Sequence, residues 1–141
     1  MVGWLVAIGF FLIALFAFSP VDAQTYEALV TRVVDGDTIR VEVEVWPGIW
    51  VRPAVRLVGI DTPELRGKCQ HEKDIAQAAK VALVELLSAF PVVLLEDVKP
   101  DKFGGRVDAV VITGAGPVAE YMIAEGHARP YEGGTREKWC E

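Results

Sequence analysis

The sequence predicts an α+β fold that is mainly β: a small barrel of five strands, with one long helix between the third and fourth strands and a short helix after the fifth. Three observations support this prediction. Apolar and polar residues alternate with a period of two over residues 38–45, and other short segments are rich in β-forming residues. Glycine and proline separate those segments at short intervals. One longer segment has apolar residues at helical spacing.

The first three predicted strands follow one another as a meander. Residues 26–34 are rich in β-forming side chains, and residues 38–45 alternate apolar with charged side chains, which is typical of a strand with one buried face. We expect a hairpin turn between them, with Gly36 free to take a positive φ. Residues 50–60 are expected to form the third strand, bent at Gly59.

The second half of the chain supplies both helices. Apolar side chains of residues 72–90 fall on one helical face, and the proline that follows ends the helix. Residues 92–98 and 106–112 are expected to be the fourth and fifth strands, and residues 117–125 a short helix before an irregular tail. Five strands with a helix between the third and fourth is the order of an OB-fold barrel.

The N-terminal segment is expected to direct export rather than to join the barrel. Residues 1–20 are almost wholly apolar, and the Val-Asp-Ala sequence before Gln24 is typical of a signal-peptidase site. We therefore expect a signal peptide over residues 1–23 and one folded domain over residues 24–141. Because the segment has no basic residue and is close to membrane-spanning length, an uncleaved membrane anchor is the alternative. In either case the domain is exported, as a periplasmic, secreted or membrane-anchored protein.

The chain has two cysteines, Cys69 and Cys140. An even number of cysteines in an exported chain predicts a disulfide, which would tie the C-terminus to the segment before the long helix. Two unpaired thiols are the alternative. A metal site at these cysteines is disfavoured, because neither has a histidine at ligand spacing.

Three short polar segments fall where strands are expected to end. The first is Asp-Gly-Asp-Thr at residues 35–38, the second runs from Arg56 to the Asp-Thr-Pro-Glu of residues 61–64, and the third is Asp-Lys-Phe-Gly-Gly-Arg at residues 101–106. Carboxylate oxygens suit Ca²⁺ or Mg²⁺, and arginine suits a phosphate that gains charge in a transition state. A further carboxylate can activate water. Together these groups are what a phosphodiesterase requires.

These three segments, in this order and at these distances, resemble the staphylococcal nuclease (thermonuclease) family, from about residue 26 to about residue 131. The resemblance implies the nuclease type of OB-fold and Ca²⁺ as the cofactor. It implies that the ion is bound by the carboxylates of Asp37 and Asp61 and by the backbone carbonyl of Thr62.

The resemblance also implies which residues act on the substrate. Glu64 is expected to be the general base that deprotonates the attacking water. Arg56 and Arg106 are expected to stabilise the five-coordinate phosphorus. Lys102 is expected to contact a terminal phosphate and Tyr131 to stack on a base.

Some of these side chains have purely structural alternatives. Lys102 would otherwise be a solvated turn residue, and Tyr131 would otherwise pack in the fold. We expect Trp46, Trp50 and Trp139 to be packing residues rather than a platform for stacked bases.

The chain departs from the family pattern in ways that leave two points open. Phe103 stands where the family has tyrosine, so a phenol contact with phosphate is not expected. The Gly-Gly pair before Arg106 stands where the family has one glycine, which leaves the register of Arg106 open. Arg56 lies five residues before Asp61, and an odd offset places two side chains on opposite faces of an ideal strand. A bend near Gly59 is therefore needed to bring both to one site.

The expected function is that of an exported, Ca²⁺-dependent nuclease that hydrolyses DNA and RNA with little sequence specificity and leaves 3′-phosphate ends. DNA and RNA are its only expected partners, and the protein is expected to be a monomer. The net charge of −6 counts against a DNA-packaging role, because nonspecific nucleic-acid affinity usually requires a basic surface. A noncatalytic OB-fold module that binds nucleic acid or a protein is the alternative, and a membrane-anchored assembly protein is a third reading.

Overall fold

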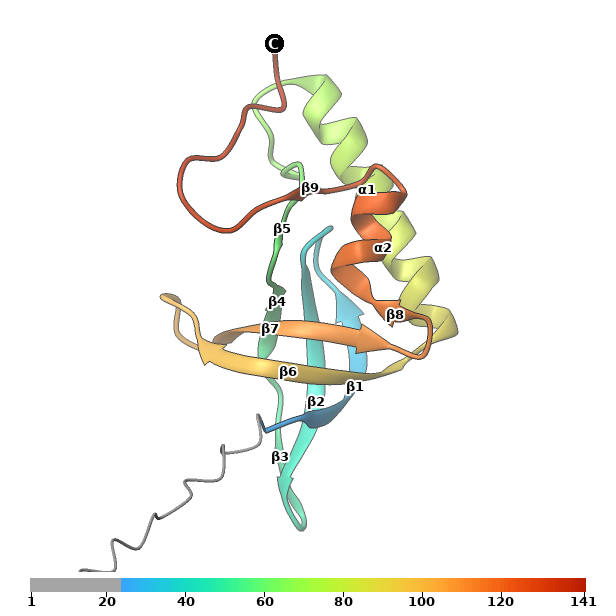
Figure 1. The fold of residues 1–141 in the computed structure, drawn as a ribbon, viewed down its shortest axis with the longest axis vertical. Coiled ribbons are helices and arrows are strands. Elements are labelled where there is room, and N and C mark those ends of the chain that lie inside the picture. Colours follow the sequence, from blue (N-terminus) through green and yellow to red (C-terminus); the bar gives the residue numbers. More distant parts are fainter. Residues whose placement is uncertain (1–23) are drawn as a thin grey trace, which may run out of the picture.

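The computed structural model describes residues 24–141, which fold around one barrel (Figure 1). The predicted signal peptide or anchor at residues 1–23 lies outside the described residues. Within residues 24–141, no helix is both long and apolar enough to cross a membrane. The elements in chain order are β1 (Tyr26–Val33), β2 (Thr38–Trp46), β3 (Ile49–Val51), β4 (Ala54–Leu57), β5 (Ile60–Asp61), α1 (Gln70–Ala89), β6 (Val92–Pro100), β7 (Arg106–Thr113), β8 (Gly116–Pro117), α2 (Val118–Ala124) and β9 (Arg129–Pro130).

Five strands close the barrel, which confirms the predicted fold class. β1 pairs antiparallel with β2 and β6, β6 pairs antiparallel with β7, and β2 pairs antiparallel with β4. The parallel pair of β4 and β7 closes the ring. The alternation in β2 has the predicted effect, because Ile39, Val41 and Val43 are buried while Arg40 between them is exposed. Burial of each such side chain stabilises the fold by roughly 1.5–3 kcal/mol.

The predicted third strand over residues 50–60 is three separate elements. Pro53 lies in the gap between β3 and β4, and Gly59, at φ 86°, lies in the gap between β4 and β5. A proline cannot donate to the ladder, and a left-handed glycine turns the chain, so the segment cannot continue as one strand. Among the described strands β3 pairs with β2 alone, and the two form a hairpin that projects from the barrel (Figure 1). Trp46 and Trp50 lie on this hairpin with 74% and 52% of their surface exposed, so the prediction that they pack in the fold was wrong.

α1 begins two residues earlier than predicted, because Cys69 is its N-cap. The Cys69 sulfur accepts from the backbone N–H of Glu72 at 3.4 Å, and the helix starts at Gln70. The buried face of α1 is apolar apart from Glu72; its other members are Ala76, Ala79, Ala82, Leu83, Leu86 and Leu87. α1 contacts β1, and α2 contacts β7, β8 and α1, so the two helices lie together at one end of the barrel (Figure 1).

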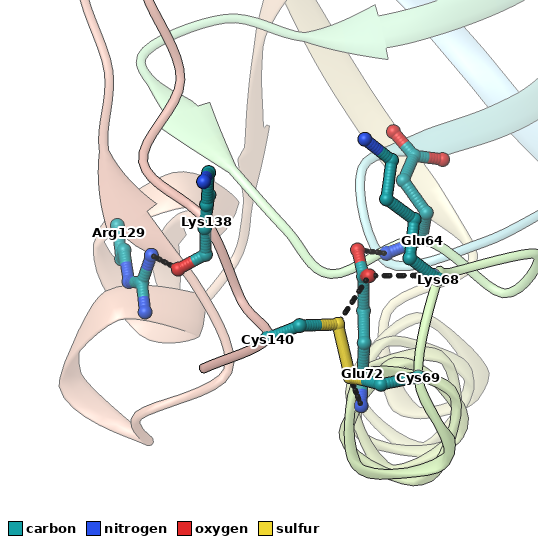
Figure 2. Close-up of a disulfide and its surroundings, with 7 residues drawn as sticks. All are labelled: Glu64, Lys68, Cys69, Glu72, Arg129, Lys138 and Cys140. Carbon is teal, nitrogen blue, oxygen red and sulfur yellow. Dashed lines mark hydrogen bonds between the residues drawn. A yellow bond between two sulfur atoms is a disulfide. The ribbon is translucent and has the colours of Figure 1, made fainter.

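The C-terminal tail is more ordered than predicted. β9 pairs antiparallel with β5, and the backbone N–H of Tyr131 donates to the carbonyl of Gly59 at 2.9 Å. The chain then loops back toward the start of α1, where Cys140 forms a disulfide with Cys69 (Figure 2). The predicted disulfide is therefore present, and it brings the end of the chain beside the segment of residues 61–68.

Candidate active site

The acidic turn of residues 35–38 connects β1 and β2 and is held by local hydrogen bonds. The carboxylate of Asp35 accepts from the backbone N–H of Asp37 at 3.1 Å, and the Thr38 hydroxyl donates to Asp37 Oδ1 at 2.9 Å. Gly36 does not take the positive φ that we predicted. A Cβ at that position would lie 3.0 Å from the Cβ of Ala79 on α1, so the glycine serves close packing against the helix.

Arg56 and Asp61 stand on either side of the kink at Gly59, as the odd offset between them required. The backbone N–H of Leu57 donates to the carbonyl of Asp37 at 2.8 Å, which fixes the acidic turn beside β4. Arg56 Nη2 lies 3.8 Å from Asp37 Oδ2. Asp61 closes β5 and is 4% exposed, and Thr62, which is equally buried, lies against the acidic turn.

Glu64 lies on a loop that a buried carboxylate of α1 holds in place. The Glu72 side chain accepts from the backbone N–H of Glu64 at 3.3 Å and from that of Lys68 at 3.0 Å (Figure 2). The carboxylate of Glu64 is itself exposed, with 57% of its side-chain surface open to solvent. Sequence reasoning placed Glu72 only as the first residue of a helix; a glutamate at the third helical position after a cap was the signal that could have found it.

The basic segment of residues 101–106 turns tightly between β6 and β7. Gly105 takes a φ of 75°, and Arg106 becomes the first residue of β7, opposite Ala54 of β4. The Arg106 side chain pairs with Asp101, which holds the pKa of that carboxyl below its ordinary value. The Arg106 guanidinium also lies 4.6 Å from the ring centre of Phe103. The two-glycine turn therefore places Arg106 on β7, the strand that pairs directly with the strand of Arg56, β4.

A hollow of about 530 Å³ brings most of the predicted substrate-binding groups together. Its lining consists of Arg56, Glu64, Asp101, Lys102, Phe103, Arg106, Asp108, Tyr131 and Arg136. Asp61 and Thr62 line a second hollow, which shares Glu64 and Arg136 with the first. Glu64 thus stands between a cationic hollow and the buried acidic residues.

Three buried polar atoms in this region have no hydrogen-bond partner: Asp61 Oδ1, Arg56 Nη2 and Asp108 Oδ1. A buried carboxylate oxygen without a donor favours a cation, and a buried guanidinium nitrogen without an acceptor favours an anion. Burial raises the pKa of Asp35 to about 6, and the negative charge of Asp37 beside it adds to this rise. The residues present therefore fit a hard cation next to a phosphate.

Within residues 24–141, one group of side chains has the spacing of metal ligands: Cys69, Glu72 and Cys140 have ligand atoms within 4.8 Å of one another. This group is not a metal site. Both cysteines are in the disulfide, so neither offers the thiolate that a metal requires. Among the described residues, the acidic turn and the Asp61 segment do not bring three carboxylates within 4.8 Å of one another. Asp37 and Asp61 are the buried carboxylates that would hold a cation, which would supply positive charge beside a bound phosphate.

The tail contributes two residues that sequence reasoning did not assign to the site. Arg136 Nη1 donates to Glu64 Oε1 at 2.8 Å, and Arg136 Nε lies 3.1 Å from Asp61 Oδ1, without the alignment of a hydrogen bond. The indole N–H of Trp139 donates to Asp61 Oδ2 at 3.2 Å. The predicted disulfide was the signal that could have found them, because Cys140 brings the preceding residues to this loop.

A comparison with family models finds a match to the staphylococcal nuclease homologue over residues 54–139. The match includes β4, the Asp61 segment, α1, the basic segment and the tail through Trp139, and it begins after the acidic turn. No match was found among the curated proteins. The matched region covers more than half of the chain, and the closed five-stranded barrel agrees with it. The chain therefore belongs to the staphylococcal nuclease homologue family.

Proposed function

We propose that this protein is a Ca²⁺-dependent nuclease that hydrolyses phosphodiester bonds of DNA and RNA with little sequence specificity. One observation carries the proposal: Arg56, Arg106 and Glu64 line one hollow, beside an Asp61 oxygen that is buried without a hydrogen-bond donor. In this proposal, the hollow would supply positive charge and a base, and Asp61 in the adjoining hollow would supply a cation ligand. A noncatalytic binding module would need only the positive charge.

In this proposal Asp37, Asp61 and the Thr62 carbonyl would hold the cation, which would neutralise charge on the phosphate when bound. The buried position of both carboxylates supports this role, because a buried anion is stable only when it is paired. Arg56 Nη2 lies 3.8 Å from Asp37 Oδ2 and makes no hydrogen bond, so it is available to a phosphate oxygen.

Glu64 would take the proton from water as the water oxygen attacks phosphorus. The new P–O bond would form opposite the bond between phosphorus and the 5′-oxygen, and that bond would break. The 5′-oxygen would take up a proton and leave, and the other fragment would keep a 3′-phosphate. Arg56 and Arg106 would pair with the two non-bridging oxygens as they gain charge. The exposure of Glu64 supports a role as base, since water reaches its carboxylate.

Low sequence specificity is supported by the composition of the hollow. Its basic side chains, Arg56, Lys102, Arg106 and Arg136, are suited to phosphate, and contacts with phosphate carry no sequence information. Lys102 and Tyr131 line the same hollow, in keeping with their proposed contacts with a terminal phosphate and a base. Phe103, 54% exposed, offers a ring but no hydroxyl.

We propose that the protein works outside the cytoplasm. The disulfide supports this location, because disulfides persist in oxidising compartments. The apolar leader that would direct export lies outside the described residues. Fractionation of cells that produce the full chain would test the location; recovery with cytoplasmic markers would contradict it.

The function is tested with residues 24–141, which contain the barrel and, among the described residues, the cluster of buried apolar side chains from Ala28 to Ala128. Heat-denatured DNA and RNA are incubated with Ca²⁺, with Mg²⁺ and with chelator, and cleavage is followed for the wild type and for Glu64→Gln. Glu85→Gln, an exposed change on α1, is the control. We expect Ca²⁺-dependent cleavage that falls roughly 10²–10⁴-fold in Glu64→Gln and not in Glu85→Gln. DNA binding without cleavage under any condition would instead support the noncatalytic module.

A further inference from the structure

The C-terminal tail places a third arginine at the proposed active site. Arg136 bridges Asp61 and Glu64, the proposed cation ligand and the proposed base, at 3.1 and 2.8 Å. The negative charge of Asp37 also attracts the Arg136 guanidinium. Arg136 also lines the cationic hollow together with Arg56 and Arg106. Its side chain is 40% exposed, so it has room to move from one set of partners to the other.

The tail that carries Arg136 is attached on both sides of it. Before it, β9 pairs with β5, and the Tyr131 hydroxyl donates to the carbonyl of Gly134 at 2.7 Å. After it, the Arg129 guanidinium stacks on the Trp139 ring at 3.5 Å and donates to the carbonyl of Lys138 at 3.1 Å. The disulfide of Cys140 completes the attachment. Arg136 is thus held at the site by specific contacts and not by the ion pairs alone.

We propose that Arg136 is a substrate-binding arginine that Asp61 and Glu64 hold until a cation binds. The inference rests on the proposed nuclease function. Without a cation, the guanidinium offsets the charge of the carboxylates. If Asp37 and Asp61 held a divalent cation, its positive charge would repel the Arg136 guanidinium and weaken the ion pairs of Arg136 with Asp61 and Glu64. The released guanidinium then pairs with a phosphate oxygen in the hollow that it already lines, and Glu64 becomes free to accept a proton.

This arrangement makes Arg136 act in opposite directions on the two ligands. It competes with Ca²⁺ for Asp61, so its removal strengthens Ca²⁺ binding. It contributes a charged contact to phosphate, so its removal weakens nucleic-acid binding in the presence of Ca²⁺. A purely structural ion pair would not produce both effects, because loss of a structural contact loosens the site and weakens both ligands.

The test measures binding in residues 24–141 by calorimetry, for the wild type, Arg136→Gln and Arg136→Lys. Arg52→Gln is the charge-matched control, since Arg52 pairs with Glu42 at the hairpin. Circular dichroism and thiol titration establish that each variant is folded with its disulfide intact. The ligands are Ca²⁺ alone, and a short single-stranded phosphorothioate oligonucleotide in saturating Ca²⁺.

For Arg136→Gln we expect the Kd for Ca²⁺ to fall about five-fold or more and the Kd for the oligonucleotide to rise by a similar factor. Arg52→Gln should match the wild type for both ligands, and Arg136→Lys should lie between. An unchanged or weaker Ca²⁺ affinity in Arg136→Gln, with Ca²⁺-dependent cleavage still present in the wild type, overturns the inference and leaves the proposed function standing. Absence of Ca²⁺ binding in every folded variant overturns both.

Discussion

The Glu72 carboxylate accepts a hydrogen bond from the backbone N–H of Glu64 at 3.3 Å, so a buried residue of α1 fixes the loop that carries the proposed base. The other oxygen of Glu72 accepts from the N–H of Lys68 at 3.0 Å, which holds the far end of the same loop. Glu72 is 7% exposed and lies beside the disulfide (Figure 2). The loop geometry at Glu64 therefore depends on a side chain that does not line the hollow of Arg56, Arg106 and Arg136.

Replacement of Glu72 should affect both stability and the rate of hydrolysis. Glu72→Gln keeps the shape but turns an amide group toward one of the two N–H donors, so at least one buried hydrogen bond is lost. We expect the free energy of unfolding to fall by about 1–3 kcal/mol. We also expect kcat to fall more than KM rises, because the loop positions Glu64 and not the substrate. Denaturant unfolding and steady-state kinetics beside Glu85→Gln measure this; a change in KM alone would argue against a positioning role.

A side chain at Gly67 should collide with Glu72. A Cβ at this position would lie 2.5 Å from Cγ and Cδ of Glu72, and Gly67 has no positive φ, so space alone requires the glycine. We expect Gly67→Ala to destabilise the protein by about 1–3 kcal/mol. The double variant with Glu72→Ala should cost less than the sum of the single changes, because the second change removes the collision. Additive losses in this cycle would show that the two positions do not interact.

The barrel could be predicted because its strands are amphipathic. Ile39, Val41 and Val43 alternate with charged side chains, and such a pattern has one stable arrangement, with the apolar face in the core. The bent third strand was harder. Pro53 and Gly59 were visible as interruptions, but whether an interruption bends a strand or ends it depends on pairing with distant strands, which the local sequence does not carry.

The site could be predicted where it consists of contiguous motifs and not where it depends on the tail. Asp61 and Glu64 lie in one short segment, so their proximity follows from the chain itself. Arg136 reaches them across a sequence separation of 72 residues from Glu64, and its approach depends on the β5–β9 pair and the disulfide together. The β5–β9 pair contains two residues of each strand, and the disulfide is a single bond. Neither feature gives a periodic pattern in the sequence.

Reduction of the disulfide should lower stability and release the tail. The bridge joins residues with a sequence separation of 71, and closure of a loop of this size contributes about 4 kcal/mol in the chain-entropy account. We expect thermal unfolding of the reduced protein and of Cys140→Ser at a clearly lower temperature than that of the oxidised wild type. Treatment of Cys140→Ser with reductant is the control and should change nothing. Equal melting temperatures for the oxidised and reduced wild type would contradict the prediction.

The free energy of unfolding of the metal-free protein should decrease as the pH rises, because the Asp35 carboxyl loses its proton. Its folded-state pKa is raised to about 6 from an ordinary value of 3.8, first by burial and then by the charge of Asp37. Between these two values the folded protein binds more protons than the unfolded chain does, so this group makes the free energy of unfolding fall as pH rises from about 4 to about 6. Asp35→Asn removes the titration and still accepts the hydrogen bond from the N–H of Asp37.

We therefore expect the melting temperature of the wild type in chelator to fall relative to that of Asp35→Asn as the pH is raised through this window. The difference between the two proteins should be largest above pH 6 and smallest near pH 4, because protonated aspartic acid and asparagine are both uncharged there. Addition of Ca²⁺ at neutral pH should reduce the difference, since a cation beside Asp37 offsets the charge that destabilises Asp35. A difference that grows toward low pH would show that Asp35 is stabilised, not strained, as an anion, and would contradict its raised pKa.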